Sequence, residues 1–251
     1  MASKTRNNNQ MSPAKMALTA AIVLFSLAII YQALFAEGPA RAAVPEPEVV
    51  ITGEPLPPAP GQDQTAESDA AIGTKLPTIE TDTFDGQAAR TIDPDDGRPK
   101  LIGLMAHHCP FCQEEIAEMG PWLQDRGIDP NHEGVATVDG VDIHLISTQH
   151  APGRPGWPTT RLTENAGLGG ELLTDDPDDT IARTLGLVGT PYWVLVDADG
   201  MIAGRVSAKV GTDVLDQWID VLASSVADAD DLDADDLELD ELDGGSTPAD
   251  D

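Results

Sequence analysis

The chain has 251 residues, which is enough for one domain of ordinary size with additional segments. Its formal net charge is -30, from 14 Lys and Arg against 44 Asp and Glu. This balance argues against non-specific binding to nucleic acid, because no basic surface is available to neutralise phosphates. Two cysteines are too few for the disulfide framework of a small secreted domain, so we expect them to serve chemistry.

The N-terminal part of the chain predicts a membrane anchor. Residues 16–36 carry no formal charge and, as a helix rising 1.5 Å per residue, can cross a hydrocarbon core of roughly 30 Å. Basic side chains within residues 1–15 place the N-terminus in the cytoplasm and the rest of the chain outside it. The alternatives are a cleaved signal peptide, with Ala40-Arg41-Ala42 as the cleavage site of a secreted protein, and a buried soluble helix.

Composition then divides the rest of the chain. Residues 37–74 are rich in proline and predict an extended, partly stiff linker. Residues 75–225 alternate between strand and helix patterns and predict the folded domain. Residues 226–251 predict an acidic disordered tail, although an amphipathic partner-binding segment is an alternative.

The first elements of the domain surround the two cysteines. Residues 100–106, KLIGLMA, form a short apolar run that predicts a buried strand. The stretch CPFCQEEIAEM, 109–119, predicts a helix whose first turn tolerates Pro110. Pro121 should end or kink this helix.

The later elements complete an α/β pattern. Residues 141–148 predict a second central strand, and residues 178–187 have apolar positions at helical spacing. Residues 192–197 and 201–207 predict an antiparallel hairpin with its turn at Ala198-Asp199-Gly200. The last stretch, 212–225, is an amphipathic helix with Thr212 or Asp213 as the candidate N-cap. This order favours a mixed sheet with helices on both faces.

The spacing of Cys109 and Cys112 is typical of a reversible dithiol–disulfide pair. At the N-terminus of a helix, partial positive charge and free N–H groups favour the thiolate of Cys109, which is the nucleophile. Cys112 lies one turn further on and can close a disulfide with Cys109.

Other uses of the pair carry less weight. A structural zinc site usually needs a second Cys-x-x-Cys pair, and a disulfide closing so short a loop stabilises little. A copper site would need a histidine beside the two thiolates, taken from the set His107, His108, His144 and His150. A domain that only binds a partner and carries out no redox chemistry is a further alternative.

These motifs together resemble the thioredoxin fold and, more narrowly, the membrane-anchored TlpA/ResA-like thioredoxins of the bacterial cell exterior. The resemblance covers about residues 75–225. It is carried by GTKLPTIETDTFDGQ (73–87) as an N-terminal strand pair, AHHCPFCQEE (106–115) as the active-site loop, and LGLVGTPYWVLVDADGMI (185–202) as the proline loop and last hairpin.

The resemblance implies roles for individual residues. Cys109 is the attacking cysteine and Cys112 the resolving one. Pro191 matches a proline that is cis in the family and faces the disulfide, and the backbone at Thr190 should pair with an extended substrate segment. Glu115 matches an acidic residue that helps to move protons to and from the thiols, which a buried carboxyl with a raised pKa could do.

The chain departs from the family pattern beside the first cysteine. His108 replaces the usual tryptophan, and when protonated it could stabilise the thiolate and make the pair more oxidising; a role-free exposed side chain is the alternative. The dipeptide between the cysteines is Pro110-Phe111, which leaves the direction of electron flow open. We assign Phe111 to substrate binding.

The sequence therefore predicts an extracytoplasmic thiol–disulfide oxidoreductase with a thioredoxin-like α/β fold. Its partners would be protein thiols and disulfides, supported by a membrane electron donor, and it would need no metal or organic cofactor. The resemblance suggests reduction of apocytochrome c thiols. The alternatives are general disulfide formation and copper delivery through Cys109, Cys112 and a histidine.

Overall fold

We analysed a computed structural model of the chain, which describes residues 47–60, 68–84, 86, 88–150 and 167–232, with side chains up to 225. All of them belong to the unit Pro45–Asp251. The predicted anchor at 16–36 and the end of the predicted tail lie outside the described residues. No helix in the described part of the chain is long and apolar enough to span a bilayer.

The secondary structure alternates between short strands and helices, as the sequence pattern predicts. In chain order the elements are β1 (Val50–Thr52), β2 (Thr78–Asp82), β3 (Ala89–Ile92), β4 (Lys100–Ala106), α2 (Pro110–Asp125), β5 (Ala136–Val138), β6 (Val141–Thr148), β7 (Leu172–Thr174), α4 (Thr180–Thr184), β8 (Tyr192–Val196), β9 (Ile202–Val206) and α5 (Thr212–Leu232).

The central sheet is mixed and has the order β5-β6-β4-β8-β9, with β7 also paired to β6. Strand β4 lies in the middle, parallel to β6 and antiparallel to β8, and β8 and β9 form the antiparallel hairpin. A second sheet joins β1, β2 and β3 in antiparallel order. The predicted thioredoxin-like α/β fold is confirmed in this arrangement.

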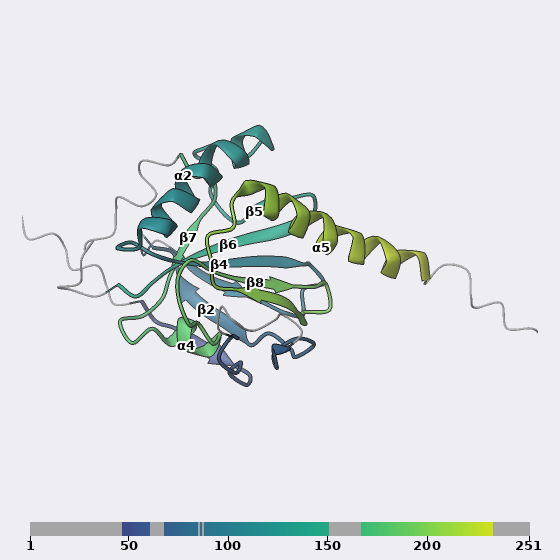
Figure 1. The fold of residues 1–251 in the computed structure, drawn as a ribbon, viewed down its shortest axis with the longest axis horizontal. Coiled ribbons are helices and arrows are strands. Elements are labelled where there is room, and N and C mark those ends of the chain that lie inside the picture. The colour runs from purple at the N-terminus through teal and green to yellow at the C-terminus, as the bar shows by residue number, and fades with distance from the viewer. Residues whose placement is uncertain (1–46, 61–67, 85, 87, 151–166, 233–251) are drawn as a thin grey trace, which may run out of the picture. The chain divides into compact units, whose positions relative to one another are not determined.

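Two apolar clusters lie on opposite faces of the central sheet because successive side chains of a strand point to opposite sides. Leu101 and Met105 of β4 pack with α2 and α5, whereas Ile102 and Leu104 pack with α4 and the smaller sheet. Figure 1 shows α2 and α5 along one side of the sheet, and α4 and β2 along the other. All seven residues of β4 are buried, as expected for a central strand.

Gly103 is the one residue of β4 that the packing requires to lack a side chain. It is paired with Trp193 of β8, and a Cβ at this position would lie 2.6 Å from the indole ring. The Trp193 side chain is fully buried and packs edge-on against Trp218 of α5. The glycine therefore makes room for the aromatic contact that joins α5 to the sheet.

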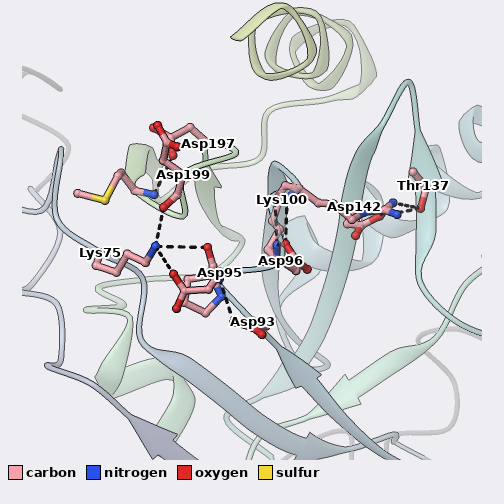
Figure 2. Close-up of polar contacts among 12 residues, drawn as sticks. Lys75, Asp93, Asp95, Asp96, Lys100, Thr137, Asp142, Asp197 and Asp199 are labelled. Atoms are coloured by element: carbon pink, nitrogen blue, oxygen red, sulfur yellow. Dashed lines mark hydrogen bonds and ion pairs between the residues drawn. The ribbon is translucent and has the colours of Figure 1, made fainter. Parts of the chain in front are cut away.

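Charged side chains gather at the starting end of β4, opposite the cysteines. Lys100 is almost fully buried and donates to Asp96 and to the carbonyl of Arg98. Figure 2 shows this pair beside Lys75, whose ammonium lies between Asp95 and the carbonyl of Asp199. These hydrogen bonds and ion pairs lie at the N-terminal end of β4, whereas the cysteines follow its C-terminal end.

The prediction that residues 37–74 form only a linker is wrong for the part that the structure describes. Strand β1 pairs with β2, and Leu56, Ala59 and Ala71 are buried in the core. The N–H groups of Leu56 and Ala59 donate to Thr184 and Gly186 at 2.8 Å. The neighbouring prolines have no N–H to satisfy, so an extended proline-rich segment can pack against the domain.

The helix boundaries also differ from the predicted ones. Helix α2 continues through Pro121 to Asp125, because Trp122 and Leu123 beyond the proline are buried in the core. Helix α4 is shorter than the predicted 178–187, since Asp179 and Gly186 have positive φ angles that lie outside a right-handed helix.

Helix α5 is longer than predicted, and it starts differently. It reaches Leu232, beyond residue 225, where we expected the tail to begin. At its start, Thr212 is already helical, and the carbonyl of Gly211 accepts the first helical hydrogen bond from Leu215. The N-cap is therefore Gly211 and neither of the predicted residues. The short strands β1, β5 and β7 were not predicted. Of the strand pair predicted within 73–87 only β2 lies there, because its partner β3 lies at Ala89–Ile92.

Candidate active site

The site is built where β4 gives way to α2. Cys109 is the N-cap of α2, with an extended backbone, and Pro110 occupies the first turn. Cys112 follows inside that turn. The predicted placement of both cysteines at the strand–helix junction is confirmed, and both are free thiols in the structure.

Cys109 is the more exposed and more acidic thiol. It is half-buried, and burial alone would raise its pKa. Hydrogen bonds from the backbone and side chain of Cys112, the side chain of Thr190 and the backbone of Phe111 outweigh that effect and leave the pKa of Cys109 below its usual range. The free N–H groups at the helix start thus stabilise the thiolate, as its position predicts.

Cys112, in contrast to Cys109, is buried and has a raised pKa. Its side chain is fully buried among the residues between α2 and the sheet, and burial raises the pKa of Cys112 to about 12. The N–H of Ala106 donates to its sulfur at 3.4 Å. The two thiols therefore differ sharply: one can be a thiolate that meets solvent, and the other stays protonated until something removes its proton.

The loop before β8 faces the exposed thiol. The sulfur of Cys109 lies 3.3 Å from the carbonyl oxygen of Thr190, and it donates to that oxygen. The bond between Thr190 and Pro191 is cis, as the family resemblance predicts. Pro191 is buried and Thr190 half-buried. Residues far apart in the sequence thus form two walls of one site.

Glu115 is fully buried on the same face of α2 as Cys112. Burial raises the pKa of Glu115 against the lowering effect of two backbone hydrogen bonds. Its carboxylate accepts the N–H groups of Val210 and Gly211 at 2.9 and 3.0 Å, just before α5 begins. The raised pKa agrees with the predicted proton carrier, and the link to α5 is a contact that the sequence did not reveal.

His108 and Phe111 both lie on the surface. His108 is exposed directly before Cys109. Phe111 lies between the cysteines and is 59% exposed, which is unusual for a large apolar side chain. The roles that we assigned to them, in tuning the thiol and in binding substrate, remain predictions.

A buried polar cluster beneath the active-site loop was missed. His107 donates to or accepts from the hydroxyl of Ser147 at 2.6 Å, and its ring lies 6.4 Å from that of His150, with Phe84 beside both. Burial, aided by His150, lowers the pKa of His107 to about 4. Because Ser147 and His150 lie on and after β6, only the parallel pairing of β4 and β6 reveals this cluster.

A metal site gains no support from the described residues. No three His, Cys, Asp or Glu side chains among them are arranged to hold a metal ion. His144 lies in β6, paired with Ile102 of β4. Burial lowers the pKa of His144 to about 4, with smaller effects from the nearby charges of Asp142, Lys100 and Asp96. The predicted copper-delivery alternative therefore finds no third ligand in this part of the chain.

Comparison with known proteins finds similar proteins by sequence and by structure. No family model matches the chain. The thiol:disulfide interchange protein DsbE of Yersinia pestis is 24% identical over 162 residues, which is 63% of this chain and 76% of that protein. The chain is thus similar in sequence to a thiol:disulfide interchange protein. The resemblance predicted from the sequence is thereby confirmed.

Solved structures of thiol:disulfide interchange proteins and disulfide oxidoreductases cover a similar share of this chain. A putative thiol:disulfide interchange protein DsbE from Chlorobium tepidum is 16% identical, covers 61% of this chain and 97% of its own, and has a TM-score of 0.48. A secreted disulfide oxidoreductase of Mycobacterium tuberculosis, homologous to E. coli DsbE, is 20% identical, covers 57% and 95%, and has a TM-score of 0.45.

Proposed function

We propose that the oxidoreductase works outside the cytoplasm, tethered by residues 16–36, and reduces disulfides of protein substrates through Cys109 and Cys112. The substrates that we propose are disulfides of apocytochrome c, whose cysteines must be thiols before haem is attached. A membrane electron donor would return the Cys109–Cys112 disulfide to the dithiol. No metal or organic cofactor takes part in this scheme.

The observation that carries the proposal is the asymmetry of the two thiols. Cys109 is reachable and has a lowered pKa, whereas Cys112 is buried with a pKa of about 12. Only the thiolate form attacks a disulfide, so Cys109 reacts first with the substrate and Cys112, still protonated, acts in the second step as the resolving thiol. A pair that served only to staple the chain would have no need of this difference.

The chemistry follows in two exchanges. The Cys109 thiolate attacks one sulfur of the substrate disulfide, forms a mixed disulfide and releases the other substrate sulfur as a thiolate. Cys112 then loses its proton and attacks the Cys109 sulfur. The second substrate thiolate leaves, the Cys109–Cys112 bond forms, and two electrons have passed to the substrate.

The second exchange needs a base for Cys112. We propose that Glu115 accepts this proton, because its carboxyl is buried on the same helix face and has a raised pKa. A carboxyl with an ordinary pKa would be a weaker base for this task. Release of the proton then returns Glu115 to its ionised form.

Features around Cys109 support a protein substrate. Phe111 is 59% and Val188 51% exposed; Phe111 lies two residues after Cys109, and Val188 two residues before Thr190. Such apolar side chains can hold the residues that flank a substrate cysteine. The backbone near Thr190 offers hydrogen-bonding groups to an extended chain, so strand-like pairing can align the substrate disulfide.

The reduction potential of Cys109–Cys112 tests the direction of electron flow. It is measured by equilibrating the protein with glutathione buffers and trapping the thiols. A potential near that of thioredoxin, about -270 mV, is expected for a reductase. A potential near about -120 mV would contradict the proposal and favour the alternative, general disulfide formation, with His108 as the first side chain to replace.

The substrate is tested by trapping. Cys112→Ser should stop the second exchange and accumulate a mixed disulfide through Cys109, whereas Cys109→Ser should form none. A disulfide-closed peptide with the sequence Cys-x-x-Cys-His, typical of haem attachment, should be trapped faster than a peptide with scattered cysteines. Equal rates would remove the apocytochrome proposal and leave a general oxidoreductase.

A further inference from the structure

Ser207 touches the loop that faces the active-site thiol. It follows the last residue of β9, and its hydroxyl donates to the carbonyl of Gly189 at 2.7 Å. Gly189 precedes Thr190, whose carbonyl lies 3.3 Å from the sulfur of Cys109. One peptide unit therefore separates the serine contact from the contact with the reactive thiol.

The approach of Ser207 to the loop is close. A Cβ added to Gly189 would lie 3.1 Å from the Ser207 hydroxyl oxygen, which is tighter than ordinary van der Waals contact. The pairing of Trp193 with Val206 brings the end of β9 beside the start of β8 and thus beside this loop. A glycine at 189 leaves the space in which the hydroxyl reaches the backbone.

The segment that carries Ser207 is itself fixed to the cysteine helix. The N–H groups of Val210 and Gly211 are bound by Glu115 of α2. Lys209 pairs with Glu118, one turn further along α2, at 2.6 Å. Residues 207–211, which we call the bridging segment, therefore join α2 on one side of Cys109 to the Gly189–Thr190 backbone on the other.

We propose that Ser207 is a positioning residue, which holds the Gly189–Thr190 backbone at the distance from Cys109 that a paired substrate chain requires. The inference rests on the proposed function and deepens it, because it assigns a residue to substrate alignment. Ser207 touches neither sulfur. Its effect should therefore fall on substrates that pair with the backbone and spare small disulfides that do not.

The test compares Ser207→Ala with Ser207→Thr, which keeps the hydroxyl, in the full-length protein. The exposed Ser224, whose hydroxyl bonds within α5, gives the control Ser224→Ala. Each variant reduces two substrates: a peptide of about ten residues with one internal disulfide, and bis(2-hydroxyethyl) disulfide, which has no peptide backbone. The melting temperature is measured for all of them.

Loss of one hydrogen bond should lower kcat/KM of Ser207→Ala for the peptide about three- to tenfold, mainly through KM. Its rate with the small disulfide should stay within about twofold, and Ser207→Thr and Ser224→Ala should resemble the wild type. Equal losses with both substrates, no loss, or no rescue by threonine would overturn the proposal. So would an alanine variant that no longer melts cooperatively. A wild type inactive on both substrates would overturn the proposed function itself.

Discussion

Cys109 and Cys112 differ in pKa although they lie within one turn of the same helix. The position of Cys109 before the first helical residue gives it the N–H groups of Phe111 and Cys112, whereas Cys112 points into the core. The N-terminus of α2 therefore lowers the pKa of Cys109 alone, because only the Cys109 sulfur accepts hydrogen bonds from these N–H groups. Local geometry and burial act together at this scale.

We predict that iodoacetamide alkylates the reduced protein at Cys109 and leaves Cys112 unmodified. The thiolate is the reacting form, so the rate at Cys109 should rise with pH and reach half its maximum below the ordinary thiol value of about 8.5. Cys112, with its pKa of about 12 and its buried sulfur, should react at least about a hundredfold more slowly at pH 7. Mass spectrometry of quenched samples reports both sites.

The variants of the two cysteines serve as controls. Cys112→Ser should still be alkylated, with a modestly changed midpoint because a hydrogen bond to Cys109 is altered, whereas Cys109→Ser should not react. A midpoint for Cys109 at or above the ordinary thiol value would contradict the lowered pKa.

At the scale of elements, Glu115 joins α2 to the start of α5. Its carboxylate binds two N–H groups that precede α5, where Gly211 has no side chain that could do so. A charged acceptor from another helix thus takes the place of a local N-cap side chain. The same carboxyl is the proposed proton acceptor for Cys112, so one residue serves both stability and chemistry.

We predict that Glu115→Gln lowers the free energy of unfolding by about 1–3 kcal/mol, because an amide cannot accept both N–H groups through its NH₂ end. The measurement is urea unfolding of the reduced protein. Glu114→Gln is the matched control, since the Glu114 side chain is 60% exposed and its ion pair with Lys209 is long, at 3.7 Å. The control should change stability by less than about 0.5 kcal/mol.

The same two variants test the proton role. With Glu115→Gln, the resolving exchange by Cys112 should slow at neutral pH and recover at higher pH, where hydroxide removes the proton. If the exchange rate and its pH profile match those of Glu114→Gln, Glu115 is only a link between helices.

For the molecule as a whole, a buried ion pair fastens the segment before β2 to the central sheet. Arg205 of β9 donates to both carboxylate oxygens of Asp69, and both side chains are almost completely buried. Arg205 also donates to the carbonyls of Pro57 and Leu185. One guanidinium therefore holds together the proline-rich segment, the end of α4 and the edge of the sheet.

We predict that Asp69→Ala destabilises the protein by about 3–5 kcal/mol, because it leaves the buried guanidinium of Arg205 without its counter-charge. Chemical denaturation of the full-length chain measures the loss. The control is Asp95→Ala, which removes a carboxylate that is 74% exposed and paired with Lys75, and should cost less than about 1 kcal/mol. Equal effects of the two variants would contradict a structural role for the proline-rich segment.

The sequence by itself determined the central elements and the reactive pair. The strands predicted at 100–106 and 141–148 coincide with β4 and β6. The first is almost entirely apolar, as expected for a strand that is buried on both faces. The strand–helix junction at Cys109 was also predictable, since its signals are local. The three-residue strands, the packed proline-rich segment and the course of α2 past Pro121 were decided by tertiary contacts that leave little local pattern.

Only the tertiary structure decided what surrounds the thiols. Thr190 contacts Cys109, and Ser207 contacts the backbone beside Thr190, although both lie many residues away from the cysteines in the chain. Local sequence patterns carry no information about such distances. The same holds for the difference in pKa between Cys109 and Cys112, because burial depends on how α2 packs on the sheet. The reactive residues can be identified from their local sequence, whereas their burial and their pKa values depend on long-range packing.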